Sequence, residues 1–400
     1  MRPDGIIISG ASGAGKSTIA QKIVELIPDS VIVQSTTTRS KRDDEEDLFY
    51  SFVTQKNFVE LRKDKKLLTD ITYRNSSYAI ERKTVDDILA ANRIPILIVS
   101  PDSIDKILSV ENYSHFSSFF LDASDDELNR RLLARDGNVD EDVKIQREQD
   151  RLLIPSYHYY LLNITIDSTC ELVKTLARFY NIGGVIPERI IRLMIECGLL
   201  IQEYSDIKNI SGASYDMTLG DEYSYGGDIC NLTDGDPFIH IEAYDCAIVC
   251  SKEKFAFPRD ISARFDLSVG LFCQGIILSN GPQVDPGFHG PLFCLLFNTS
   301  NQRISLKKGQ HYATIEFHKL LESTQPYKGQ YQNKEKIMQY LPHQPVKGAG
   351  SEIRESLEKV REEAELLRNA NKHHNEAILI TVILGLIAFA ESMFLLLLST

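Results

Sequence analysis

The segment Gly10-Ala-Ser-Gly-Ala-Gly-Lys16-Ser17 decides how the first part of this chain folds. It follows the apolar run Gly5–Ser9 and precedes the helical pattern Thr18–Leu26. A glycine-rich turn that ends in Lys and Ser, set between a strand and a helix, is typical of a P-loop, whose backbone N–H groups surround phosphate oxygens. The sequence therefore predicts a nucleotide-phosphate site here; the alternative is a chance glycine-rich turn.

Each residue type in this loop has its own expected role. The glycines let the backbone approach the phosphates, Lys16 neutralises the β- and γ-phosphates, and the Ser17 hydroxyl ligates Mg²⁺. We therefore expect ATP and Mg²⁺ as cofactors. The expected ATP-binding residues are Gly10, Ser12, Gly13, Gly15, Lys16, Ser17 and Thr18.

Outward from this loop, residues 1–182 alternate short apolar runs with helical patterns, which predicts an α/β domain with a parallel sheet. The expected strands are Gly5–Ser9, Val31–Val33, Ile94–Val99 and Phe119–Leu121, and the expected helices are Thr18–Leu26, Thr84–Ala91 and Asp125–Arg135. A Gly-Gly pair and a proline within Asn181–Pro187 mark a domain boundary.

The next part, residues 187–320, has a different pattern of predicted elements. One expected helix, Pro187–Gly198, is followed by short β-type runs between turn residues, which predicts a barrel or jelly roll. Examples of these runs are Ala247–Cys250, Gly275–Leu278, Leu292–Phe297 and Tyr312–Phe317.

Composition limits the possible partners. A chain of 400 residues predicts two domains plus additional segments. The formal net charge of −12 argues against nucleic acid as a partner but leaves mononucleotides open, because a small ligand needs only a few local cations. The seven cysteines lack zinc-type spacing, so we expect reduced thiols.

Two groups of arginines accompany the predicted P-loop. Arg39 and Arg42 are three residues apart and could together bind one phosphate group. Arg131, Arg135 and Arg147 flank an acidic loop and could stabilise a phosphoryl group in transfer; the alternative is a solvated helix face.

Together with the P-loop, the segment Ser35–Arg42 and the following Tyr50 resemble guanylate kinase over most of residues 4–180. The resemblance implies a nucleoside-monophosphate-kinase fold with Lys16, Arg39, Arg135 and Arg147 as catalytic residues. It implies that the acceptor's monophosphate is held by Ser35, Arg39, Arg42, Tyr50 and Tyr78.

The chain departs from this family where the family reads guanine. Thr69, with Asp70 beside it, stands at the position of a base-reading Glu. Ile98–Ser100, with Asp102 beyond it, replaces an Asp-x-Asp. The resemblance therefore implies phosphate binding but does not extend to guanine specificity.

Ala213–Gly220 and Val284–Gly290, together with Leu296–Asn298 and Gly309–Phe317, resemble the trimeric dUTPase and dCTP deaminase superfamily over roughly residues 187–320. The resemblance implies a homotrimer, or a multiple of three, and a second nucleotide site. The residues assigned to that site are Asp216, Ser268, Asp285 and Phe288, with Asp285 at the deoxyribose.

Two observations limit this second assignment. An Asp before Pro-Gly is also a common turn former, so Asp285 has an alternative structural role. Leu295 stands where the deaminases carry a general acid/base Glu. Because a leucine cannot transfer protons, we expect no deamination.

The C-terminal part comprises a polar linker, 321–350, and two helical segments. Ile353, Leu357 and Val360 begin a heptad seam that predicts a coiled coil over 351–372 or a lone amphipathic helix. Ala377–Leu398 is apolar and predicts a transmembrane helix over 377–399. Glu391 would line a polar constriction or merely interrupt an anchor.

Two functions from different classes follow. The first is a nucleoside-monophosphate kinase joined to a non-deaminating nucleotide-binding domain. It would be held in the membrane by a single C-terminal span, with the nucleotide domains in the cytoplasm because Arg368 and Lys372 precede that span. The alternative is a nucleotide-sensing membrane effector, for example in antiphage defence.

Overall fold

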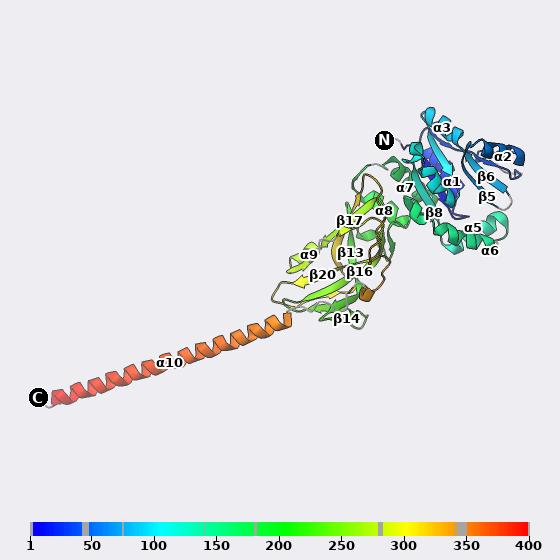
Figure 1. The fold of residues 1–400 in the computed structure, drawn as a ribbon. Coiled ribbons are helices and arrows are strands. Elements are labelled where there is room, and N and C mark those ends of the chain that lie inside the picture. The colour runs from blue at the N-terminus through cyan, green and yellow to red at the C-terminus, as the bar shows by residue number, and fades with distance from the viewer. Residues whose placement is uncertain are drawn as a thin grey trace.

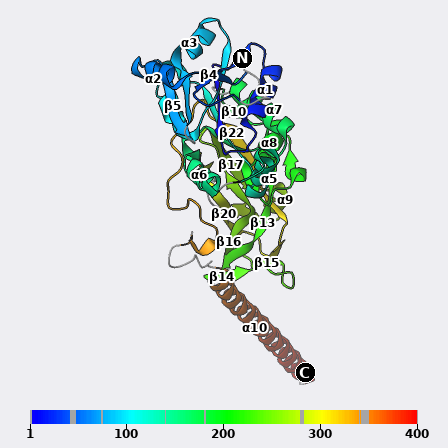
Figure 2. The ribbon, with the colours of Figure 1, turned by 90° about the vertical axis from the view of Figure 1, so that its right-hand side faces the viewer.

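The structure, a computed structural model, describes residues 3–41, 48–73, 76–139, 141–179, 182–278, 283–339, 341 and 350–398. Within the last helix, side chains are described for residues 353, 355–371, 380–386 and 388. An α/β domain is followed by a β domain and by one long helix that projects away from both (Figure 1). The view turned by 90° shows the same order from end to end (Figure 2).

The first domain is built on a parallel five-stranded sheet in the order β2-β7-β1-β8-β9. Its central strands are buried on both faces, as a parallel sheet covered by helices requires. The four predicted strands are confirmed, and β9 is an addition. The strands are β1 (Ile6–Gly10), β2 (Ser30–Ile32), β7 (Ile94–Ile98), β8 (Ser117–Asp122) and β9 (Tyr159–Leu162).

Several helices of this domain begin at side chains that cap them. Thr54, Ser124 and Thr165 each accept a hydrogen bond from a backbone N–H in the first turn, which satisfies a donor that the helix leaves unpaired. The three predicted helices are confirmed. The helices are α1 (Lys16–Leu26), α2 (Gln55–Lys63), α3 (Arg82–Ala90), α4 (Ile104–Leu108), α5 (Asp125–Asp136), α6 (Glu141–Arg151) and α7 (Ile166–Arg178), with short 3₁₀ turns η1 (Pro101–Ser103), η2 (Glu111–Tyr113) and η3 (Ile154–Ser156).

A second, four-stranded sheet in the order β4-β3-β6-β5 stands beside the parallel sheet. These strands were not predicted: β3 and β4 have three residues each, and β5 and β6 mix polar with apolar residues. They are β3 (Ser35–Thr37), β4 (Tyr50–Phe52), β5 (Leu67–Tyr73) and β6 (Ser76–Glu81).

The second domain is mainly β, as predicted. An 11-stranded sheet runs along the path β18-β20-β16-β13-β22-β17-β19, with β10, β11, β12 and β14 paired at its sides, and β15 pairs with β21. Its elements are β10 (Gly184–Val185), α8 (Glu188–Glu196), β11 (Leu200–Glu203), η4 (Ile207–Asn209), β12 (Ile210–Ser211), β13 (Ser214–Tyr225), β14 (Asp228–Asn231), β15 (Phe238–Ile241), β16 (Cys246–Ala256), β17 (Ile261–Leu267), α9 (Val269–Phe272), β18 (Ile276–Leu278), β19 (Gln283–Val284), β20 (His289–Asn298), β21 (Ile304–Lys307) and β22 (His311–Lys319). All seven cysteines are free thiols.

The described part of the predicted linker packs on the β domain. The Tyr327 N–H donates to the Pro286 carbonyl at 2.8 Å, and the Phe288 and Tyr327 rings lie 5.8 Å apart. Ile337, in the turn η5 (Ile337–Gln339), is completely buried. This segment is therefore tied to the β domain up to residue 339.

The last helix, α10 (Gly350–Leu398), is continuous through both predicted C-terminal segments. The apolar residues of the heptad seam are exposed in the single chain, for example Leu357 at 53%. Among the described residues, no helix is both long and apolar enough to cross a bilayer, so the predicted membrane span is not supported. The side chain of Glu391 lies outside the described ones.

The two domains share one hydrophobic core and a buried ion pair. Lys319 Nζ lies 2.8 Å from Asp260 Oδ2, and these side chains are 9% and 1% exposed. The hydroxyl of Tyr159, from β9 of the first domain, donates to the same carboxylate. Side chains of both domains therefore form one buried cluster, in which Lys319 of the β domain and Tyr159 of the first domain both contact the Asp260 carboxylate.

We predict that Asp260→Ala lowers the free energy of unfolding by about 3–5 kcal/mol, because it leaves the buried Lys319 ammonium without its counter-charge. Urea unfolding of the full chain measures the effect. Asp234→Ala, which removes an exposed carboxylate 3.8 Å from Lys308, is the matched control with an expected effect below about 1 kcal/mol. Equal effects of the two substitutions would contradict a stabilising junction.

Candidate functional site

The predicted P-loop connects β1 to α1, and its glycines adopt conformations that other residues rarely reach. Gly10, Gly13 and Gly15 have φ of 132°, 90° and 87°. A Cβ on Gly10 would lie 1.9 Å from the carbonyl oxygen of Leu121 in β8. The loop therefore needs glycine there, both for backbone conformation and for its close approach to the neighbouring strand.

Lys16 is the first residue of α1, and its side chain folds back onto this loop. Its Nζ donates to the carbonyls of Gly10 and Ala11 at 2.8 and 2.9 Å. Burial lowers the pKa of Lys16 to about 8; the nearby Asp150 carboxylate opposes this shift and Arg135 reinforces it. An ammonium group that is this poorly solvated gains strongly from an anionic ligand.

Lys16 lies at the wall of a pocket of about 640 Å³ that brings together residues distant in the sequence. The P-loop forms one part, the four-stranded sheet another, and α5 and α6 a third. Predicted site residues that line the pocket are Gly10, Ser12, Lys16, Ser35, Arg39, Tyr50, Tyr78 and Arg135. Gly13, Gly15, Ser17, Thr18 and Arg147 do not line it, and Arg42 lies outside the described residues.

The predicted monophosphate-binding side chains gather because of strand register. Ser35 pairs with Tyr50 across β3 and β4, and Thr37 pairs with Tyr78 across β3 and β6. The Tyr50 and Tyr78 rings meet edge to face at 6.2 Å, and the guanidinium of Arg39 lies 5.0 Å from the Tyr50 ring centre. A cation fixed over an aromatic ring is directed into the pocket, where it can pair with a phosphate.

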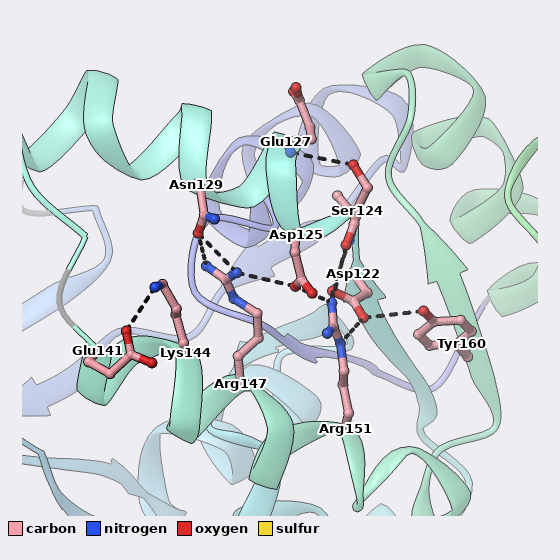
Figure 3. Close-up of polar contacts among 11 residues, drawn as sticks. Asp122, Ser124, Asp125, Glu127, Asn129, Glu141, Lys144, Arg147, Arg151 and Tyr160 are labelled. Carbon is pink, nitrogen blue, oxygen red and sulfur yellow. Dashed lines mark hydrogen bonds and ion pairs between the residues drawn. The ribbon is translucent and has the colours of Figure 1, made fainter.

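The arginines of helices α5 and α6 have two different roles. Arg135 lines the pocket. Arg147 is 3% exposed and donates to Asn129 at 3.1 Å and to Asp125 at 3.3 Å, as Figure 3 shows. In this structure Arg147 therefore holds α6 against α5, and its predicted catalytic role is not visible in its contacts.

Arg151 lies one turn beyond Arg147 and belongs to the same cluster (Figure 3). It pairs with Asp122 at 2.8 Å and with Asp125 at 2.9 Å. Asp122 ends β8 and is 1% exposed, and Tyr160 also donates to it at 3.2 Å. This arginine was not singled out in the sequence, where it reads as one more charge on a helix.

Two further side chains near the P-loop were missed. Asn163 follows β9, is buried, and donates from Nδ2 to the Ala14 carbonyl of the loop at 2.7 Å. Asp150 lines the pocket, and burial raises the pKa of its carboxyl group. A polar residue directly after a buried strand was the available signal for Asn163, whereas nothing local distinguished Asp150 from the other acids of α6.

The metal site has one expected protein ligand, Ser17, which is exposed in the first turn of α1. Among the described residues, no group of three or more His, Cys, Asp or Glu side chains could hold a metal ion.

Of the residues assigned to the second site, Asp216 lies on a strand of the β domain and the other three follow strands. Asp216 on β13 pairs with Thr314 on β22 and accepts a hydrogen bond from its hydroxyl at 2.9 Å. Ser268 follows β17 and precedes α9, and Asp285 follows β19, which pairs with β17. Phe288 is 7% exposed beneath Tyr327, so it is packed in the core of the single chain.

Leu295 lies on β20 opposite Ile248 of β16. An aliphatic pair occupies this register position. The β domain therefore keeps the predicted sheet but has no proton-transferring group at this position.

A strand–P-loop–helix unit that faces a fixed arginine and two tyrosines defines a P-loop nucleotide-binding domain, here followed by a β domain. The guanylate kinase family model matches residues 2–180, and the dCTP deaminase-like model matches residues 186–320. The first domain of the chain belongs to the guanylate kinase family, and the second belongs to the dCTP deaminase-like family.

Individual relatives agree with both matches. The chain is 30% identical to a guanylate kinase of Paramagnetospirillum magneticum over 175 residues. The aligned region covers 43% of this chain and 82% of the relative. The chain is 34% identical to a dCTP deaminase of Thermococcus kodakarensis over 136 residues, and this aligned region covers 34% of the chain and 85% of the relative. A guanylate kinase of Anaeromyxobacter dehalogenans is 29% identical over 178 residues, 43% of this chain and 79% of the relative.

We predict that ATP binding weakens above pH 8. The pKa of Lys16 is lowered to about 8, so this group is charged below that pH and loses its proton as the pH rises through it. Since bound phosphate favours the charged form, Kd should rise by up to about tenfold per pH unit above pH 8. Equilibrium titration between pH 7 and 9.5 measures this, and Lys16→Arg, which stays charged, should show no such rise. A wild-type Kd that is constant to pH 9.5 would disprove the assignment.

Proposed function

We propose that the first domain transfers the γ-phosphoryl group of ATP to a nucleoside monophosphate. One observation supports this most directly: the P-loop with Lys16 and the cation–aromatic group Arg39–Tyr50–Tyr78 line the same pocket. Two phosphate-binding groups in one pocket suit two nucleotides whose phosphates must meet in line.

The chemistry follows from these positions. An oxygen of the acceptor phosphate attacks the γ-phosphorus, the bond to the β,γ-bridging oxygen breaks, and ADP and a nucleoside diphosphate result. Lys16 and Arg135 offset the negative charge on the transferred group, while Arg39 and Tyr50 orient the acceptor. Mg²⁺, held by Ser17 and the phosphates, would supply further charge neutralisation.

The second domain is proposed to bind a deoxynucleotide without deaminating it. The aliphatic contact of Leu295 leaves no acid or base at that register position. From the family resemblance, this domain is also proposed to associate as a trimer or a multiple of three; Val269 and Phe272 of α9, 74% and 67% exposed, offer apolar side chains for such a contact.

The membrane-effector alternative is less well supported than the kinase. It depends on a bilayer-spanning helix, and none is found in the described part of the chain. The kinase function depends instead on side chains that the structure brings together.

Lys16→Ala should abolish phosphoryl transfer, lowering kcat by at least about a hundredfold, because charge stabilisation dominates this chemistry. The measurement is a coupled ADP-release assay on the full chain with ATP, Mg²⁺ and each ribo- and deoxynucleoside monophosphate. Lys22→Ala, which removes an exposed lysine of the same helix paired with Asp167, is the control with unchanged turnover. Wild-type protein that phosphorylates none of these nucleotides would refute the kinase proposal.

For the second domain, we predict that dCTP incubated with the full chain yields no ammonia. Release of ammonia in a coupled assay is the measurement, and one of the dCTP deaminases is the positive control. Ammonia formation by the wild-type protein would mean that another group replaces the acid/base at Leu295.

A further inference from the structure

The wall of the pocket beyond the tyrosines is neutral. It is built by β5 and β6, where Thr69 stands opposite Ile80 and Ile71 opposite Tyr78. Thr69 is 5% exposed and Ile80 is 2% exposed, and both line the pocket together with Ile71, Thr72 and Ala79. Since directly paired residues of antiparallel strands share a face, this wall continues from Tyr78 as a row of hydroxyl and aliphatic groups.

The acid next to Thr69 does not reach this wall. Asp70 alternates to the other face of β5, where its carboxylate lies 2.6 Å from Arg62 Nε of α2. Asp70 is therefore neutralised by a partner and is absent from the pocket lining.

The carboxylates that do line the pocket lie elsewhere, on η1 and α6. Asp102 accepts a hydrogen bond from Ser100, whose hydroxyl is also 3.1 Å from that of Ser103. Asp150 accepts from Gln146 at 2.9 Å and interacts with the ammonium of Lys16. The described β5–β6 wall thus offers a base only hydroxyls and aliphatic groups.

This composition discriminates between bases. Guanine presents two adjacent donors, N1–H and the 2-amino group, which a carboxylate with two acceptor oxygens can satisfy together. A single threonine hydroxyl cannot replace both acceptor oxygens of a carboxylate, so it suits an edge with one donor group beside an acceptor. The pairing edges of cytosine, thymine, uracil and adenine each carry one donor group, whereas guanine carries a second donor group beside its N1–H. Guanine on this wall would leave a donor unpaired, which is costly in a buried site.

We propose that Thr69 is a specificity-determining residue and that the acceptor of this domain is a nucleoside monophosphate whose base carries one donor group on its pairing edge, rather than GMP, whose base carries two. The inference rests on the proposed kinase function and specifies its substrate class. It depends on the buried position of Thr69, on the ion pair of Asp70 with Arg62, and on the neutral neighbours of Thr69 in the pocket wall.

The test measures kcat/KM on the full chain for GMP, dGMP, AMP, CMP, dCMP, UMP and dTMP, with ATP and Mg²⁺. We expect kcat/KM for at least one nucleotide whose base has a single donor group to exceed that for GMP by about tenfold or more, the lower range of what paired base contacts discriminate. Thr69→Glu should shift the ratio towards GMP by about tenfold or more. Thr69→Gln, similar in size but uncharged and with one acceptor oxygen, should shift it far less.

The outcomes separate the inference from the proposed function. Turnover that is highest with GMP in the wild-type protein would overturn the inference and leave the kinase standing. An unchanged ratio in a Thr69→Glu protein with wild-type thermal stability would overturn it as well. If no monophosphate is phosphorylated, the kinase proposal fails, and the inference is then tested by calorimetric binding of the same nucleotides to the wild-type protein. GMP should bind about tenfold more weakly than the nucleotide that binds best. This comparison among nucleotides uses the wild-type protein alone, so it does not depend on whether a variant folds.

Discussion

The first domain depends on how closely the loop after β1 approaches β8. The N–H of Ala11 donates to the carbonyl of Leu121 at 3.1 Å, and only a residue without a Cβ fits at Gly10. This contact fixes where α1 begins, and therefore where Lys16 stands. Asn163, at the end of β9, binds the loop from the other side through the Ala14 carbonyl. Strands that are neighbours in the parallel sheet thus hold the loop at their carboxyl ends, where α/β folds usually bind ligands.

Electrostatics divides the charged groups of this domain into two sets. Arg39 and Arg135 line the pocket, and the weakly solvated Lys16 in the same pocket interacts with Asp150 and Arg135. Arg147 and Arg151 instead pair with Asp122 at the end of β8 and with Asp125 and Asn129 of α5 (Figure 3). A strongly acidic chain can therefore still offer a locally cationic site, because its acids pair with cations elsewhere.

The two domains pack against each other and do not form independent units. Tyr159 on β9 and the Asp260–Lys319 pair of the β domain share one buried cluster. The same strand leads to Asn163 and so to the P-loop. A continuous core surrounds these contacts, and separating the domains would expose both a buried charge and apolar surface.

By itself, the sequence determined the P-loop, the parallel strands around it and the β character of the second domain. Those features follow from local rules: glycines permit a tight turn, and apolar runs of strand length bury themselves. The resemblance to guanylate kinase pointed to Ser35, Arg39, Tyr50 and Tyr78, and the structure brings these four side chains to one pocket. The tertiary structure decided which side chains meet. It turned Asp70 towards Arg62, placed Asp150 beside Lys16, and directed Arg147 to α5 instead of the pocket. These outcomes depend on strand register and on helix packing between distant segments, and no local pattern of residues encodes either.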